Sequence, residues 1–213
     1  MRLPLSRHPT AFALATTLVG GCAPKLTPLA GAPAPARLPD TALPAGRHKI
    51  VFRWQLDDGD LSARGDGVAR LASPDSARLD LFIGGVAGAT AVLIGDSLTA
   101  PGGDMVRRLV PPAPMLWATL GRLAIPALPD TTVRVDSGVA RADIGHPVVW
   151  RVTFRGDTIA RLEHVDGGRV VEWIQRDGNH LTYRHEAPRR SLTMDIVRSE
   201  PVQEFDAAIW RFQ

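Results

Sequence analysis

Apolar and polar residues alternate along most of the chain beyond residue 46, which is the pattern of half-buried β-strands. In the first such stretch, the apolar side chains Ile50, Phe52, Trp54 and Leu56 alternate with Lys49, Arg53, Gln55 and Asp57. The pattern predicts further strands over 61–72, 76–83, 89–94, 98–100, 148–154, 158–164, 170–175, 180–185 and 192–197, and one within 133–143. Turns rich in Gly, Asp and Asn separate the later strands. Because such turns join neighbouring strands in hairpins, we predict an antiparallel meander.

One segment, Pro112 to Ala124, departs from this alternation and predicts a helix. Met115, Leu116, Leu120 and Leu123 lie within reach of one helical stripe, and the Ile-Pro pair at 125–126 ends the segment. The chain is therefore predicted to be mainly β, in the α+β class, with a helix available to cover one side of the sheet.

The first 21 residues have the pattern of a secretory signal peptide. Arg2 and Arg7 precede a stretch from Ala11 to Gly21 that carries no charge. A helix of that length spans only about half of the roughly 30 Å hydrocarbon core of a bilayer, so we do not expect a permanent transmembrane helix.

The end of this segment, Val19-Gly20-Gly21-Cys22, resembles the lipobox of bacterial lipoproteins. The resemblance implies cleavage before Cys22, an S-diacylglycerol group on its thiol and N-acylation of the new amino terminus. Ala23 after the cysteine favours sorting to the outer membrane under the enterobacterial rule. The alternative is an ordinary signal peptide with an incidental cysteine.

Residues 22–46 are predicted to be an acylated cysteine followed by a tether. The segment 23–46 is rich in Pro and Ala and has no hydrophobic period, so it is expected to be an extended spacer that reaches about 70 Å. Residues 47–213 remain as one β-rich domain, which is long enough to bury a core.

Charge and motifs exclude several classes of function. The chain has 25 Lys and Arg against 22 Asp and Glu, and removal of residues 1–21 leaves 23 basic residues. This near balance argues against a nucleic-acid partner. The histidines show no metal-ligand spacing, and no nucleophile or phosphate-loop motif is present, so we predict no metal site, no cofactor and no catalytic residue.

The order of lipobox, tether, strands, amphipathic helix and long meander resembles the LolA/LolB superfamily, and LolB-like lipoproteins in particular. The local similarities are GDGVARLASPDSARLD (65–80), LFIGGVAGATAVL (81–93) and MLWATLGRLAIP (115–126). The resemblance implies a curved antiparallel half-barrel of roughly ten strands covered by one to three helices. It also implies an outer-membrane location with the domain facing the periplasm.

A curved sheet with an apolar concave face would enclose a site for lipid or acyl chains such as palmitate, and binding would remove apolar surface from water. The candidate lining residues are Phe52, Trp54, Leu79, Leu81, Val92, Leu116, Leu120, Trp150 and Trp173. Ordinary core packing is the alternative for each, because the sequence does not reveal whether a void remains.

In LolB, an exposed apolar residue on a loop between strands helps to insert lipoproteins into the membrane. Val86 is the matching position here, although it is smaller than the expected Leu, and an incidental turn residue is the alternative. We therefore predict a non-enzymatic, lipid-anchored protein in lipid or lipoprotein handling. The alternative is an accessory lipoprotein that holds an envelope protein partner.

Overall fold

The computed structural model describes residues 23–59 and 61–212, so the predicted signal peptide and acylation site, Cys22, lie outside the described residues. The described chain forms one 13-stranded sheet in which neighbouring strands are antiparallel. The strands of the first half are β1 (Ala32–Ala34), β2 (Arg47–Asp58), β3 (Leu61–Ala72), β4 (Ser76–Ile83), β5 (Val86–Ile94) and β6 (Ser97–Thr99). Those of the second half are β7 (Thr131–Asp136), β8 (Val139–Ile144), β9 (Trp150–Arg155), β10 (Thr158–Asp166), β11 (Arg169–Asp177), β12 (His180–His185) and β13 (Arg190–Val202).

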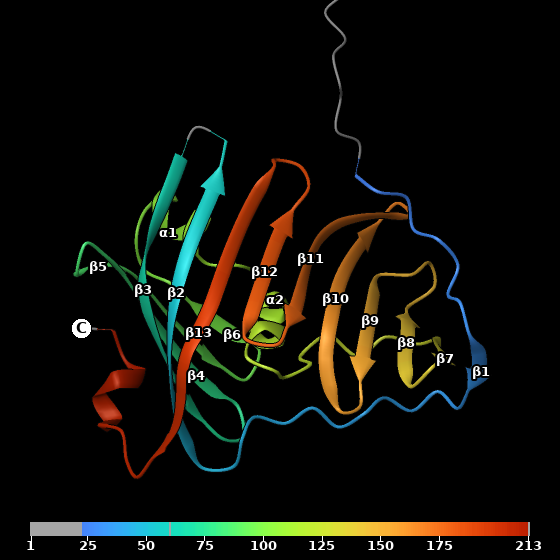
Figure 1. Cartoon of the computed structure of the whole chain (residues 1–213), viewed down its shortest axis with the longest axis horizontal. Coiled ribbons are helices and arrows are strands. Elements are labelled where there is room, and N and C mark those ends of the chain that lie inside the picture. Colours follow the sequence, from blue (N-terminus) through green and yellow to red (C-terminus); the bar gives the residue numbers. More distant parts are fainter. Residues whose placement is uncertain (1–22, 60, 213) are drawn as a thin grey trace, which may run out of the picture.

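The sheet is open, with the order β1-β7-β8-β9-β10-β11-β12-β13-β2-β3-β4-β5-β6. It curves around two short helices, α1 (Asp104–Leu109) and α2 (Ala113–Thr119), which lie behind it in Figure 1. A 3-10 helix, η1 (Ala207–Trp210), follows the last strand. The prediction of a mainly β, curved antiparallel half-barrel covered by helices is confirmed.

The helical segment differs from its prediction at both ends. The helix α2 ends at Thr119, because Gly121 adopts a left-handed conformation with φ of 96° and the N–H of Arg122 turns back to the carbonyl of Trp117. The first helix, α1, was not predicted, since its six residues are too few to show a helical period.

The single strand predicted within 133–143 is two strands, β7 and β8. Ser137 and Gly138 both have positive φ, 50° and 77°, which closes a tight hairpin between them.

The segment 23–46 is not the free spacer that its composition predicted. Its strand β1 pairs with β7, and Leu43 is 4% exposed within the core. Thr41 accepts a hydrogen bond from the N–H of Leu123, 2.8 Å away, so the segment also touches the chain that follows α2. The tether is therefore part of the folded domain along most of its length.

Candidate functional site

The concave face is the face of the sheet that curves around α1 and α2. Successive side chains of a strand point to opposite faces of the sheet. Those that point to the concave face include Trp54 of β2, Leu79 and Leu81 of β4, and Leu192 and Met194 of β13. All five are buried. They form the floor of the candidate site.

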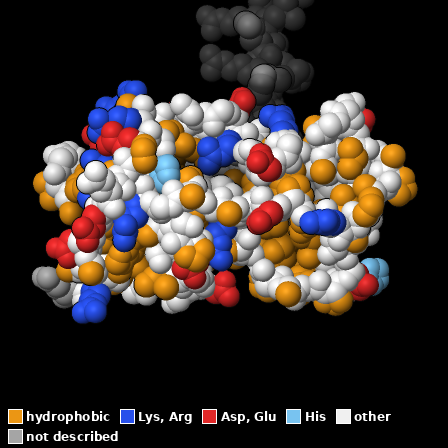
Figure 2. Space-filling view, turned by 90° about the horizontal axis from the view of Figure 1, so that it is seen from below, with side chains coloured by type: hydrophobic (Ala, Val, Ile, Leu, Met, Phe, Trp, Pro, Cys, Tyr) orange, Lys and Arg blue, Asp and Glu red, His pale blue; other side chains and the backbone are white. Residues whose placement is uncertain are grey.

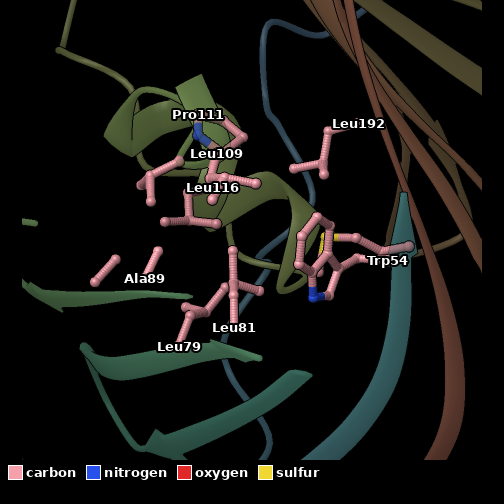
Figure 3. Close-up of a pocket in the computed structure, with 11 residues that line it drawn as sticks. Trp54, Leu79, Leu81, Ala89, Leu109, Pro111, Leu116 and Leu192 are labelled. Atoms are coloured by element: carbon pink, nitrogen blue, oxygen red, sulfur yellow. The ribbon is translucent and has the colours of Figure 1, made fainter. Parts of the chain in front are cut away.

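The helical cover comprises residues 100–124 and contains both helices. Leu116 of α2, Leu109 at the end of α1 and Pro111 between the helices lie over the floor, as Figure 3 shows, and Val110 also lines the cavity. They enclose an apolar cavity of about 10 Å³, which is the space of a single water molecule. The cover therefore fills the concave face almost completely in this conformation.

Seven of the nine predicted lining residues belong to the core between the sheet and the cover. Trp54, Leu79, Leu81 and Leu116 line the cavity. The other three, Phe52, Leu120 and Trp150, belong to the same buried cluster without lining the cavity.

Val92 and Trp173 lie on the opposite, convex face, so their assignment to the cavity was wrong. Val92 follows Thr90, whose hydroxyl donates to Asp80 on the convex side of β4. Trp173 stacks against the guanidinium of Arg161 at 4.2 Å and donates through Nε1 to Glu186 at 2.9 Å. The core side chains next to them in the sequence are Ala91 and Leu93 beside Val92, and Ile174 beside Trp173.

Several lining residues were not identified from the sequence. Ala89 and Ala91 of β5 face the cavity, and their spacing of two from each other was the available signal. Leu109, Val110 and Pro111 lie in the unpredicted helix and the link after it. Their place in the cavity depends on a crossover that no local pattern specifies.

The cover is attached to the sheet through polar contacts at the ends of both helices. Arg190 of β13 donates through Nη1 to the carbonyl of Arg107 in α1 at 3.2 Å. Arg176 of β11 donates through Nη2 to the carbonyl of Thr119 in α2 at 2.6 Å. Carbonyls in the last turn of a helix have no partner within the helix, so these side chains supply it. Trp117 adds a third contact, from Nε1 to the carbonyl of Gly95 at 2.9 Å.

A buried polar network supports the Arg190 contact from below. Arg190 donates to the Tyr183 hydroxyl at 2.8 Å, and that hydroxyl donates to Glu172 at 2.9 Å. Nδ1 of His164 lies 3.1 Å from the other oxygen of Glu172, and its ring stacks on Trp150. Burial, and then the charge of Glu172, raise the pKa of the Tyr183 hydroxyl, which therefore remains a neutral donor.

A second polar cluster lies on the convex face. Asp80 is buried between Arg70 and Arg78, and it accepts a hydrogen bond from Thr90 at 3.0 Å. Burial raises the pKa of Asp80, but the bonds from Arg78 and Thr90 and the charges of Arg78 and Arg70 outweigh it, so the pKa lies below its ordinary value. Arg78 also donates to the carbonyl of Ile209 at 2.5 Å, which holds the C-terminal segment against this face. The cluster is a structural anchor.

Val86 lies at the tip of the β4–β5 hairpin, directly after the turn at Gly84 and Gly85. Its side chain is 71% exposed, and its cross-strand partner Ile83 is 40% exposed. The hairpin projects at the left of Figure 1. It therefore presents a small apolar tip to solvent.

Two further properties concern only the described part of the chain. None of its helices has the length and apolar character needed to cross a bilayer. Within 23–59 and 61–212, no three His, Cys, Asp or Glu side chains gather in a way that could hold a metal ion.

Comparison with known proteins gives a likeness in structure rather than in sequence. No protein-family model and no curated protein sequence matches this chain. A LolA superfamily protein from Nitrosomonas europaea superposes with a TM-score of 0.51 at 8% identity, over 81% of this chain and 93% of that one. A DUF1329 family protein from Desulfovibrio piger superposes with a TM-score of 0.52 at 9% identity, over 78% of this chain and 90% of that one. The open, covered sheet of this chain is therefore a LolA-like fold.

Proposed function

We propose that this chain is an envelope lipoprotein that binds lipid or acyl chains between its concave face and the helical cover. Acyl groups on Cys22 would hold it at the outer membrane, with the domain in the periplasm. Its role would be the handling of lipids or lipoproteins, by binding and release and without a chemical step.

The observation that carries this proposal is the enclosed apolar cavity under the cover. Its floor combines large side chains, such as Trp54 and Leu81, with small ones, such as Ala89 and Ala91. An acyl chain laid on this floor would remove apolar surface from water at about 25 cal/mol per Å². The cavity volume of about 10 Å³ requires the cover to move before a chain can enter.

The way the cover is attached makes such movement feasible. Its two helices have six and seven residues, and isolated helices of this length are unstable in water. Arg176 and Arg190 each bind one helix end through hydrogen bonds that can exchange for water. Each bond of this kind contributes about 1–3 kcal/mol. A ligand would have to offset these two bonds and also the exposure of side chains that the cover buries, such as Leu116 and Trp117.

Uptake of a fluorescent fatty acid by the Cys22→Ala chain tests the proposal directly. We expect saturable binding, and native mass spectrometry should detect a co-purifying lipid. The double variant Arg176→Met/Arg190→Met should take up the probe faster, because both helix contacts are lost. Arg161→Met on the convex face is the matched control and should leave the rate unchanged. If neither the parent nor the double variant binds the probe, the carrier function is rejected.

The anchor is tested separately. The Cys22→Ala chain should lose acylation, seen by mass spectrometry, and should leave the membrane fraction. Unchanged membrane association together with an unchanged mass would reject the lipoprotein proposal. Val86→Asp should weaken lipid transfer to vesicles if the hairpin tip enters a bilayer, while Thr99→Asp on an exposed edge strand should not.

A second candidate is an accessory lipoprotein that holds a protein partner. The near-complete filling of the cavity favours it, since a sheet that stayed packed against its cover would have no space for cargo. Crosslinking in intact cells would then recover a stable envelope complex, and the purified chain would carry no lipid.

A further inference from the structure

The tether enters the domain at one defined edge of the sheet, which we call the upper rim. The rim consists of the carboxyl end of β2 and the turns after β8, β10 and β12. These lie on the same side because neighbouring strands run in opposite directions. Register pairs such as Arg190 with Asp58 and His164 with Trp150 align these strand ends. The rim forms the top of Figure 1.

Backbone pairing fixes the tether to the rim immediately after the predicted anchor. Lys25 bridges Arg169, the N–H of Leu26 donates to the carbonyl of Gly168 at 2.9 Å, and the N–H of Val170 donates to the carbonyl of Pro24 at 3.0 Å. Arg169 also donates through Nη1 to the carbonyl of Ala23 at 3.0 Å. Ala23 follows Cys22 directly in the sequence, so little chain remains to separate acyl groups on Cys22 from the β10–β11 turn.

The same rim carries a cleft lined by three arginines. Arg184, Arg189 and Arg190 face it from the β12–β13 hairpin, and Asp57 is its one acidic lining residue. The cleft measures about 280 Å³, which is enough for a phosphate group with its substituents.

Two of the three arginines in the cleft, Arg184 and Arg189, have guanidinium groups that make few contacts with the described residues. Within the described chain, Arg189 makes no ion pair, and Arg184 lies 3.5 Å from its partner Glu186. Arg190 already donates to Arg107 and Tyr183 and its Nε is buried, so it adds positive charge to the cleft rather than free donors. Guanidinium groups bind phosphate through paired donors, so this cleft suits an anionic headgroup.

We propose that the upper rim lies against an anionic phospholipid surface, with a headgroup phosphate in the cleft formed by Arg184, Arg189 and Arg190. The position of Ala23, next to the predicted anchor, and the charge of the cleft both favour this surface. The opposite edge, which Figure 2 shows from below, carries apolar side chains interrupted by charges of both signs. The inference rests on the proposed anchor at Cys22 and adds the orientation that this anchor imposes.

Hydrogen–deuterium exchange of the acylated protein in phosphatidylcholine/phosphatidylglycerol vesicles tests the orientation. Amides at 167–169 and 186–190 should exchange at least about fivefold more slowly than in detergent, while those at 156–157 and 178–179 on the opposite edge should not change. Equal protection of both edges, or protection of neither, would overturn the proposal. If mass spectrometry finds no acyl group, the thiol of Cys22, the one cysteine in the sequence, is coupled to a maleimide lipid. Amide exchange at the same two sets of residues is then measured on this conjugate.

Vesicle partitioning of the non-acylated Cys22→Ala chain tests the cleft independently of the anchor. Each arginine near an anionic bilayer strengthens binding about fivefold, so Arg184→Glu/Arg189→Glu should weaken partitioning by about 25-fold or more. Arg155→Glu/Arg198→Glu makes the same charge change away from the rim and should have at most a few-fold effect. Equal losses in both variants, or equal binding to neutral and anionic vesicles, would reject the cleft. If the chain took up no fatty acid but the rim variants still lost binding to anionic vesicles, only the carrier function would be rejected.

Discussion

The tether and the helical cover are both long, proline-containing connections, yet they are attached to the sheet in different ways. The tether, residues 23–46, binds through backbone hydrogen bonds to β7 and to the β10–β11 turn. The cover, residues 100–124, binds through side chains that reach its helix ends. Backbone pairing fixes a segment in register, whereas the hydrogen bonds and apolar packing that hold the cover, such as the burial of Leu116 and Trp117, set no strand register. Under the proposed function, the tether would position the domain and the cover would move.

The largest expected effect comes from removing the centre of the cover. Trp117→Ala should lower the free energy of unfolding by about 3–5 kcal/mol, because the indole is completely buried and its N–H binds the carbonyl of Gly95. Urea unfolding measures the loss. Trp117→Phe keeps most of the ring volume and should cost clearly less; similar small losses in both variants would mean that the cover contributes little to stability.

Leu43→Ala tests whether the tether is part of the core. Leu43 is 4% exposed, so its truncation should cost about 2–4 kcal/mol in thermal or urea unfolding. A free spacer would show no change. Arg37→Ala, at an exposed position of the same segment, is the control and should remain within about 0.5 kcal/mol of the parent.

Gly31→Ala should loosen β1 without unfolding the sheet. Gly31 has φ of 108°, and an added Cβ would lie 2.7 Å from the carbonyl oxygen of Val135. We expect a loss of about 1–3 kcal/mol together with faster amide exchange in β1. Gly46→Ala has a similar positive φ of 81° but open space around the new Cβ, so its loss should be smaller. Equal effects would show that the β1–β7 contact is unimportant.

The smallest loss of stability is expected at the contact between the tether and the cover, where Thr41 meets Leu123. Thr41→Val removes the acceptor for the N–H of Leu123 and should cost about 1 kcal/mol, measured by differential scanning calorimetry. Thr41→Ser keeps the hydroxyl and should restore most of the stability. If Thr41→Val also speeds fatty-acid uptake, the tether and the cover are coupled.

The strands were predictable because apolar residues recur at every second position, but the facing of individual residues was less secure. The run Ala91-Val92-Leu93 is apolar at every position, so the alternation of apolar and polar residues could not show which face of the sheet Val92 occupies. Trp173 was misassigned because Glu172, a charged residue, points into the core, where Tyr183 and His164 satisfy it. A buried carboxylate with partners from distant strands leaves no local signal.

The tether shows a different limit of sequence reasoning. Its proline content correctly indicated extended chain, yet composition does not reveal whether such chain is free or bound to a sheet. The pairing of β1 with β7 joins residues about a hundred positions apart, and no local pattern encodes that contact. The cavity was similarly beyond prediction, since its volume depends on how closely separate segments pack.

The pairing of β1 has a further consequence for how copies of this protein avoid one another. An open sheet exposes backbone donors and acceptors at its margins, which can recruit a strand from a neighbouring molecule. β1 occupies the margin at β7, and Pro33 at its centre has no N–H to offer beyond it. A protease that cut the tether before β1 would release the domain from its predicted anchor, whereas a cut after β1 would free that margin as well. If the protein aggregated after a cut behind β1 but not after a cut before it, the tether would also prevent the sheets of neighbouring molecules from pairing.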